Sequence, residues 1–276
     1  MLFDTHMHSK WSGDCEAEPL DMIASAREKG LPGLTFTDHL DWDFPSVPHF
    51  FDLDLEHYLP EMRQIARTQS TDSFRIRVGL ELGLQTHLVE KHRALLENYD
   101  FDVVIGSIHQ VDGVDPYYDS YFKGRSFHDA YLDYFETTLE NLNAFTDFDT
   151  LGHIDYIARY GQRFAKMHGG TIEDGALRYT DYTEVIDAIL QRLIRCDKAL
   201  EVNTAPFRQQ LPEPNPSRDI LRRYHELGGR MITIGADAHT PQDVAIGFAS
   251  LGDWLKDCGF FSYVVFDHRR PLEFFF

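Results

Sequence analysis

The sequence predicts an α/β fold in which short strands and helices alternate around a parallel sheet. Short apolar runs rich in strand-forming residues alternate with segments whose apolar residues recur at helical spacing, which is the pattern of repeated βα units. With 276 residues, the chain can bury a full core as one α/β barrel or as two smaller domains. Because no internal repeat, low-complexity tract or linker is visible, we expect a single domain over residues 1–276.

Seven strands are expected from the apolar runs, at residues 2–8, 33–39, 75–82, 102–109, 149–154, 199–204 and 231–237. The helices expected between and after them cover residues 19–29, 55–68, 87–98, 127–145, 182–194, 217–227 and 241–257. The helix over 182–194 has the clearest pattern, because its apolar residues keep i, i+3, i+4 spacing for more than two turns. Glycines that favour helix ends follow three of the helices, at Gly30, Gly228 and Gly259.

The first predicted strand carries two histidines that share one face. Side chains two residues apart on a strand point the same way, so His6 and His8 project together. Imidazoles in this arrangement can hold one ion of zinc, iron, manganese or a similar metal. An ordinary sheet face would also accommodate the pair, which alone does not decide between the two interpretations. A second pair of metal-binding residue types with the same spacing occurs near the other end of the chain, in Asp237-Ala238-His239, and this favours the metal site.

Polar side chains recur at the carboxyl ends of the seven predicted strands. They are His6 and His8, Asp38 and His39, Glu81, His109, His153, Glu201 with Asn203 and Thr204, and Asp237 with His239. In a closed parallel barrel these strand ends share one rim, which is where barrel active sites lie. Histidines placed only for core packing would not prefer strand ends so consistently. The pattern therefore indicates a metal centre on that rim.

The composition limits the partners and the location of the protein. A formal net charge of −19 argues against long nucleic acid as the main partner, because a phosphate backbone binds a basic surface. A small phosphate can still bind where metal ions supply positive charge. The three cysteines are widely spaced and form no Cys-X-X-Cys pair, which is typical of a reduced protein without disulfides. No signal peptide or stretch of transmembrane length appears, so we expect a cytoplasmic protein without a membrane partner.

Six short motifs belong together in the sequence, and they are His6-Met7-His8, Thr37-Asp38-His39, Gly79-Leu80-Glu81, Gly106-Ser107-Ile108-His109, Gly152-His153-Ile154-Asp155 and Asp237-Ala238-His239. In order and spacing they resemble the PHP (polymerase and histidinol phosphatase) metal-dependent phosphoesterases over nearly the whole chain. Residues 200–204 and 224–229 look like the histidinol-phosphatase branch of that family. The resemblance implies a distorted (β/α)7 barrel with a trinuclear metal centre in its mouth.

The resemblance also implies the ligands of three divalent ions. Carried over by motif position, the three ligand sets are His6, His8, Glu81 and Asp237; Glu81, His109 and His153; and Asp14, His39 and His239. Asp14 has two neighbouring rivals, Cys15 and Glu16, because the family places an acidic residue or a histidine a few positions past the His-X-His pair. Histidine and carboxylate ligands suit zinc, iron and manganese alike, so the identity of the ions stays open.

Hydrolysis of a phosphate ester at such a centre uses a hydroxide that the ions make available near neutral pH. Glu81 is the expected bridge between two ions, and Asp237 is the expected proton acceptor as well as a ligand, so we take both as catalytic. Arg159 and Arg208 follow barrel strands and resemble phosphate-binding positions of the branch; the alternative for each is a solvated surface loop. Ser107 completes the candidate substrate-binding group as a polar donor that supports the site.

The loop after His109, over residues 111–119, is acidic and aromatic and carries Asp112, Asp115 and Asp119. Histidinol phosphate has an amine and an imidazole at the end away from its phosphate. An acidic, aromatic rim can hold that cationic end by charge and by cation–π contact. A solvated surface loop explains the same composition equally well.

Three functions are compatible with these features. The leading hypothesis is a phosphatase that hydrolyses L-histidinol phosphate, a small phosphate monoester, in histidine biosynthesis. A second is a PHP phosphoesterase that acts on nucleotides or oligonucleotide ends, although the net charge and the absence of basic clusters count against long polynucleotides. A third is a non-catalytic metal-binding module, which nine intact ligand positions disfavour. The oligomeric state is left open by the sequence.

Overall fold

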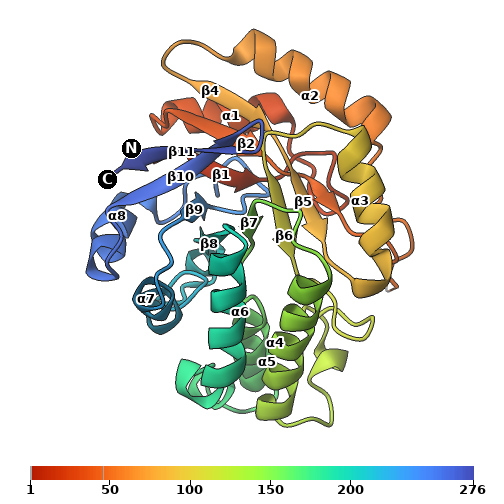
Figure 1. The fold of residues 1–276 in the computed structure, drawn as a ribbon, viewed down its shortest axis with the longest axis vertical. Helices are drawn as coiled ribbons and strands as arrows, with labels where there is room; N and C mark the ends of the chain where they lie inside the picture. Colours follow the sequence, from red (N-terminus) through yellow and green to blue (C-terminus); the bar gives the residue numbers. More distant parts are fainter. Residues whose placement is uncertain (1, 46) are drawn as a thin grey trace.

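The structure is a computed structural model that describes residues 2–45 and 47–276. Its central strands all pair in parallel, and they are β1 (Asp4–Met7), β2 (Gly33–Phe36), β3 (His39–Leu40), β4 (Arg75–Val78), β5 (Leu80–Gly83), β6 (Val104–Ser107), β7 (Thr150–Leu151), β8 (Ala199–Asn203) and β9 (Ile232–Gly235). They form a three-stranded sheet in the order β1-β2-β4 and a six-stranded sheet in the order β3-β5-β6-β7-β8-β9. The strands lie at the centre of the molecule, between the flanking helices (Figure 1).

Backbone hydrogen bonds join the two sheets into one closed ring of seven strand positions. The predicted strands over 33–39 and 75–82 are each divided in two, but Glu81 N still donates to Asp38 O at 3.1 Å across the break. On the opposite side, Asp237 N donates to His6 O at 2.8 Å, so the segment after β9 pairs with β1. The expected distorted (β/α)7 barrel is therefore confirmed, and the breaks in two strands are its distortion.

Helices cover the outside of the barrel (Figure 1). They are α1 (Pro19–Glu28), α2 (Leu55–Gln69), α3 (Val89–Asn98), α4 (Phe127–Ala144), α5 (Ile157–Met167), α6 (Thr183–Arg195), α7 (Arg218–Glu226) and α8 (Phe248–Asp257). Short 3-10 helices lie at η1 (Thr86–Leu88), η2 (Asp119–Tyr121), η3 (Glu173–Gly175), η4 (Tyr179–Asp181) and η5 (Ala205–Gln209). The pattern over 182–194 is confirmed in α6, which buries Ile186, Ile189, Leu190 and Leu193. Its apolar stripe faces the core, as amphipathic spacing requires.

Besides the two divided strands, two helices and a hairpin differ from the sequence prediction. Helix α8 begins at Phe248 rather than at residue 241, because Ala245 and Gly247 adopt left-handed φ angles of 54° and 77° that interrupt a helix. Helix α5 was not predicted, and neither was the antiparallel hairpin of β10 (Ser262–Asp267) and β11 (Arg270–Phe275). The hairpin lies beside β1 (Figure 1), where Phe3 N donates to the Tyr263 hydroxyl at 3.0 Å.

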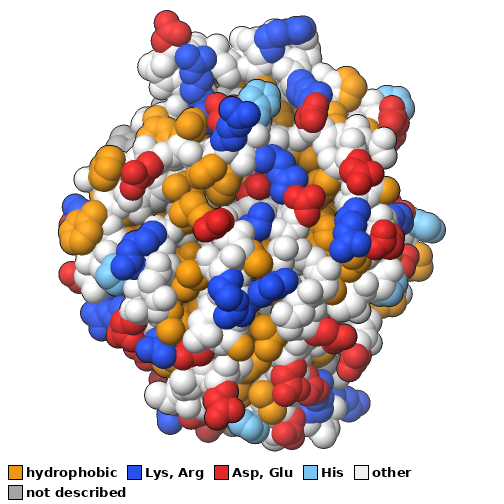
Figure 2. Space-filling view, viewed as in Figure 1, with side chains coloured by type: hydrophobic (Ala, Val, Ile, Leu, Met, Phe, Trp, Pro, Cys, Tyr) orange, Lys and Arg blue, Asp and Glu red, His pale blue; other side chains and the backbone are white. Residues whose placement is uncertain are grey.

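Most of the core is one large apolar cluster, whose members range from Phe3, just before β1, to Val265 on the hairpin; a smaller second cluster includes Val103 and Phe266. Figure 2 shows acidic, basic and apolar side chains interspersed over one face of the molecule, without a continuous basic stripe on that face of the described chain. In residues 2–45 and 47–276, no helix has the length and hydropathy needed to span a membrane.

Candidate metal centre

A buried carboxylate, Glu81 on β5, lies at the middle of the site. Its Oε1 oxygen is 2.9 Å from Nε2 of His153 and 3.2 Å from Nε2 of His109. The Ser107 hydroxyl donates to the same oxygen at 2.7 Å. These residues come from the carboxyl ends of three neighbouring parallel strands, so the barrel itself brings them together.

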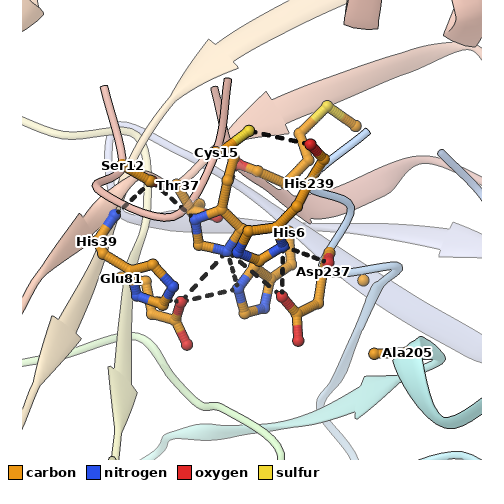
Figure 3. A network of polar contacts seen from close by, with 12 residues as sticks. His6, Ser12, Cys15, Thr37, His39, Glu81, Ala205, Asp237 and His239 are labelled. Carbon is orange, nitrogen blue, oxygen red and sulfur yellow. Dashed lines mark hydrogen bonds and ion pairs between the residues drawn. The ribbon is translucent and has the colours of Figure 1, made fainter. Parts of the chain in front are cut away.

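The second oxygen of Glu81 faces a different group of imidazoles. Oε2 lies 3.1 Å from Nε2 of His6, 3.4 Å from Nε2 of His8 and 3.0 Å from Nδ1 of His39. His6 and His8 alternate on one face at the end of β1, as strand periodicity requires, and their Nε2 atoms are 3.2 Å apart. One carboxylate therefore stands between two sets of histidines, and Figure 3 shows its contacts with the set that includes His6 and His39.

A third group of side chains lies on the outer side of His8. The His8 ring stacks between the rings of His39 and His239, at centroid distances of 4.2 and 4.1 Å. Nε2 of His239 is 3.2 Å from an Asp14 oxygen, and Nε2 of His39 is 3.8 Å from it. Asp237 reaches the same group, because its Oδ1 oxygen is 3.4 Å from His8 Nε2 and 3.5 Å from His239 Nδ1.

The neighbours of Asp14 do not take its place. The Cys15 thiol donates to the backbone oxygen of His239 at 3.1 Å (Figure 3), and Glu16 is exposed to solvent. The structure thus places all nine predicted ligands within one cluster, with Asp14 at its solvent side. Which of them bind which ion stays a prediction.

The unsatisfied atoms of the cluster fit a metal centre. Glu81 Oε2, His39 Nδ1 and His239 Nε2 are buried, and none has a well-oriented hydrogen-bond partner in the described residues. Buried polar atoms are normally paired, so several unpaired ones in one place indicate a missing partner. Imidazole and carboxylate donors in groups of three suit zinc, iron and manganese. The residues present therefore fit divalent cations.

One imidazole and the central carboxylate have pKa values that suit ligation directly, whereas neighbouring carboxylates raise the pKa values of His6, His39 and His109 against the effect of burial, so these three hold protons that a cation would displace. Burial and the neighbouring His239 and His39 imidazoles hold the pKa of His8 well below its ordinary value, so His8 is neutral. Although burial opposes it, the imidazoles of His6, His39 and His109 hold the pKa of Glu81 well below its usual range. Neutral imidazole and ionised carboxylate are the forms that bind metals.

Two arginines lie beside the cluster. Arg159 on α5 is 4% exposed; it donates from Nη2 to Asn203 Oδ1 at 2.8 Å and from Nη1 to Asp237 Oδ2 at 3.3 Å. Arg208 on η5 donates to the backbone oxygen of Asp237 at 2.5 Å and is only partly buried. Both guanidinium groups thus converge on Asp237 from different elements, and neither is a solvated surface residue.

A cavity of about 480 Å³ opens over the cluster and is lined by both arginines and by seven of the nine predicted ligands. Its remaining wall is largely aromatic, with Phe44, Phe51, Tyr117, Tyr118, Tyr156 and Tyr160. Ser107 is not part of this wall, because its hydroxyl is buried against Glu81. Ser107 therefore supports the carboxylate from behind and does not face the space that a substrate would occupy.

The acidic loop contributes less to the cavity than its composition suggests. Asp115 lines the cavity, whereas Asp112 and Asp119 are absent from the lining among the described residues. Asp119 instead lies 3.9 Å from Arg163 and 3.6 Å from His168.

Comparison with known families gives a match to the PHP domain over residues 4–205. The chain belongs to the PHP family. A protein named "Probable histidinol-phosphatase" from Clostridium acetobutylicum is 31% identical, over 99% of this chain and 100% of that protein. A histidinol-phosphatase from Lactococcus lactis subsp. lactis is 29% identical, over 97% of this chain and 95% of that protein.

The solved structures extend the likeness to three dimensions. Histidinol phosphate phosphatase from Lactococcus lactis subsp. lactis, complexed with zinc, L-histidinol and phosphate, superposes with a TM-score of 0.85 at 27% identity. The match covers 98% of each chain. The family resemblance expected from the motifs is therefore confirmed, together with the PHP-type fold.

The sequence alone gave no role to two carboxylates that contact predicted ligands of this PHP protein. Glu201 on β8 lies 2.5 Å from Nδ1 of His6, and Asp41 lies 2.8 Å from Nδ1 of His109. A partner on the far ring nitrogen fixes the tautomer and aims the other nitrogen at the metal. The signal for Glu201 was its place at a strand end; Asp41 lies two residues past His39 and had no such signal.

Strand glycines make room for these two carboxylates. A Cβ atom at Gly83 would lie 1.9 Å from Asp41 Oδ1, and one at Gly235 would lie 2.7 Å from Glu201 Oε1. Glycine inside a strand commonly marks the close approach of another group. The PHP site therefore depends on small residues in the strands as well as on its ligands.

Proposed function

We propose that residues 1–276 form a single-domain, metal-dependent phosphomonoesterase that hydrolyses L-histidinol phosphate to L-histidinol and phosphate in histidine biosynthesis. The observation that carries the proposal is one cavity wall that combines a buried cluster of imidazoles and carboxylates with two arginines. Relatives that match nearly the whole chain are named for this activity. A related structure holds zinc, L-histidinol and phosphate together, which supports the choice of substrate.

The cluster supplies the ligands for three divalent ions of zinc, iron or manganese. The proposed sets are His6, His8, Glu81 and Asp237; Glu81, His109 and His153; and Asp14, His39 and His239. When bound, the ions neutralise the phosphate and acidify a water molecule so that hydroxide is available near neutral pH. Glu81 is the residue that serves two sets, because its two oxygens face different groups of histidines.

The other residues bind the substrate and handle its protons. The Arg159 and Arg208 guanidinium groups match phosphate oxygens through pairs of N–H donors. Asp237 lies between both arginines and His8, and it is placed to accept the proton that leaves the attacking water. Water adds to phosphorus, the P–O bond to the alcohol breaks, and the alcohol oxygen takes up a proton.

Phosphate release from L-histidinol phosphate tests the proposal. The protein is purified without chelator and assayed beside 4-nitrophenyl phosphate and a nucleoside monophosphate. The expected result is a higher kcat/KM for L-histidinol phosphate than for either comparison ester, lost on chelation and restored by zinc, iron or manganese. Metal-loaded protein that releases no phosphate from any ester would support the non-catalytic alternative, and a preference for the nucleotide would support the second alternative.

A further inference from the structure

The turn that carries Asp115 is built to hold this residue in the cavity wall. Val111 and Val114 pair through two backbone hydrogen bonds of 3.0 Å, with Asp112 and Gly113 between them at φ angles of 50° and 73°. This is the geometry of a tight two-residue turn. The Asp115 backbone oxygen then accepts from Tyr118 N at 3.0 Å, which fixes the next residues.

Asp115 is a buried carboxylate without a cationic partner. Its residue is 8% exposed, and its Oδ1 oxygen accepts from Tyr117 N at 2.7 Å and from the Tyr156 hydroxyl at 3.3 Å. No described residue donates to Oδ2, and no described lysine, arginine or histidine forms an ion pair with Asp115. A buried charge is costly unless it is paired. Burial accordingly raises the pKa of Asp115 to about 6, a shift that a bound cation would reverse.

Asp115 is separated from the metal ligands by one aromatic ring. The Tyr156 ring lies 5.0 Å from that of His153 and 5.6 Å from that of His109, and its hydroxyl reaches Asp115. A phosphate ester whose phosphate lies at the metal cluster and the arginines can extend its alcohol part along Tyr156. That alcohol part then meets Asp115. A carboxylate beside an aromatic face favours a cation at that position.

Resting on the proposed function, we propose that Asp115 selects the substrate: it binds a cationic nitrogen of the alcohol part of the phosphate ester, so that the site prefers cationic monoesters to neutral ones. The two nearby aspartates do not share this role. Asp119 already faces Arg163 and His168, and Asp112 lies on the exposed side of the turn. Both serve as matched controls on the same loop.

The test compares Asp115→Asn with Asp112→Asn and Asp119→Asn. Asparagine keeps the size of the side chain and tolerates the left-handed φ of residue 112. The measured quantity is the ratio of kcat/KM for L-histidinol phosphate to kcat/KM for 4-nitrophenyl phosphate, which has no cation. Loss of a hydrogen bond to a charged group should lower this ratio about ten- to a hundred-fold in Asp115→Asn. The two control variants should keep the wild-type ratio.

Inhibition of 4-nitrophenyl phosphate hydrolysis gives a second readout. The inhibition constant of L-histidinol should rise in Asp115→Asn, whereas that of inorganic phosphate should follow the control variants. Two further esters show which nitrogen Asp115 binds: phosphoethanolamine has an amine, and 2-(imidazol-4-yl)ethyl phosphate has the imidazole ring alone. The ester that carries the bound nitrogen should lose kcat/KM relative to 4-nitrophenyl phosphate in Asp115→Asn, as L-histidinol phosphate does. Metal content and melting temperature are measured to confirm that each variant is folded and loaded.

The outcomes separate this inference from the proposed function. A wild-type enzyme without preference for L-histidinol phosphate would overturn the proposed function. A wild-type preference that persists unchanged in a folded, metal-loaded Asp115→Asn protein would overturn the role of Asp115 alone. If Asp115→Asn fails to fold, Asp115→Ser, which also removes the charge, takes its place, and an unchanged substrate ratio in that folded variant would equally contradict the inference.

Discussion

At the scale of single residues, Glu81 is a fully buried carboxylate at the middle of the candidate metal centre. Each of its oxygens faces imidazoles from a different part of the barrel, and Ser107 donates to one of them. Burial of this carboxylate is tolerable because positive charge surrounds it. A substitution at Glu81 therefore tests the proposed bridge between two ions more directly than a substitution of any single histidine does.

Glu81→Gln should lower kcat about a hundred-fold or more, because an amide carries no charge to hold two ions and such ions are worth several kcal/mol of transition-state stabilisation. Turnover and metal content are measured together, with the exposed Glu90→Gln as a control. The bridging assignment is wrong if the variant keeps near-native turnover and a full complement of metal.

Replacing either arginine by alanine should lower kcat/KM to a similar extent, but the two replacements should differ in their effect on the free energy of unfolding. Arg159→Ala and Arg208→Ala should each lower kcat/KM about ten- to a hundred-fold, the usual effect of losing a charged hydrogen bond to phosphate. Neither should lose metal, because a guanidinium does not bind cations. Arg159→Ala should also lower the free energy of unfolding by about 1–3 kcal/mol more than Arg208→Ala, since it leaves buried partners such as Asn203 unpaired. Wild-type kinetics in both would place the phosphate elsewhere.

Asp155 gives a pH dependence whose sign follows from burial. Burial raises its pKa to about 6, above the value of an unfolded aspartate, although Asn215 and Ser217 donate to it. The folded state therefore holds this proton more tightly, and the stabilisation is present at low pH and lost as the pH rises through about 6. The loss amounts to about 2 kcal/mol between pH 4 and pH 8.

Denaturant unfolding of the wild type and of Asp155→Asn at several pH values isolates this contribution. The free energy of unfolding of the wild type should fall relative to that of Asp155→Asn as the pH rises from 4 to 8, because asparagine does not titrate. A difference that is constant over this range, at equal metal content, would contradict the raised pKa.

At the scale of elements, the clustering of the predicted ligands could be expected from the sequence, because it depends on local features. Strand periodicity pairs His6 with His8, and parallel strands bring residues at their carboxyl ends to one rim. Asp41 could not be predicted, since its partner His109 lies 68 positions away and only the tertiary fold joins them. Helix α5 was missed because it buries Arg159 and Gly161, and no rule of apolar periodicity counts a buried arginine. The β10–β11 hairpin was missed because β11 is mostly exposed and lacks strand alternation.

Gly83→Ala tests how far a strand glycine supports the centre. Its new methyl group would overlap Asp41 Oδ1 and push that carboxylate away from His109. Metal affinity, measured by equilibrium dialysis, should fall about ten- to a hundred-fold, as for other losses of a residue that orients a ligand. Asp41→Asn, which changes charge but not size, should give a similar loss. Native affinity in both variants would show that Asp41 does not tune the site.

At the scale of the whole molecule, metal binding should be linked to folding. The cluster gathers carboxylates in a chain whose formal net charge is already −19, and divalent cations relieve their repulsion in the folded state only. Chelation should therefore lower the melting temperature and abolish phosphate release, and both should recover when metal returns. Elemental analysis should find about three ions per chain, the number that nine ligands support. One ion or none in active protein would refute the trinuclear centre.

The closure of the barrel between β1 and the segment after β9 also determines when the barrel can form during synthesis of the chain. His6 is made well before its backbone partner Asp237, which lies 231 positions later in the sequence. Contacts at such separation form only after most of the chain is available. A nascent chain on the ribosome thus exposes an incomplete set of histidines until residue 239 has emerged. Proteins whose synthesis ends between residues 154 and 236 would carry seven of the nine predicted ligands but no finished centre.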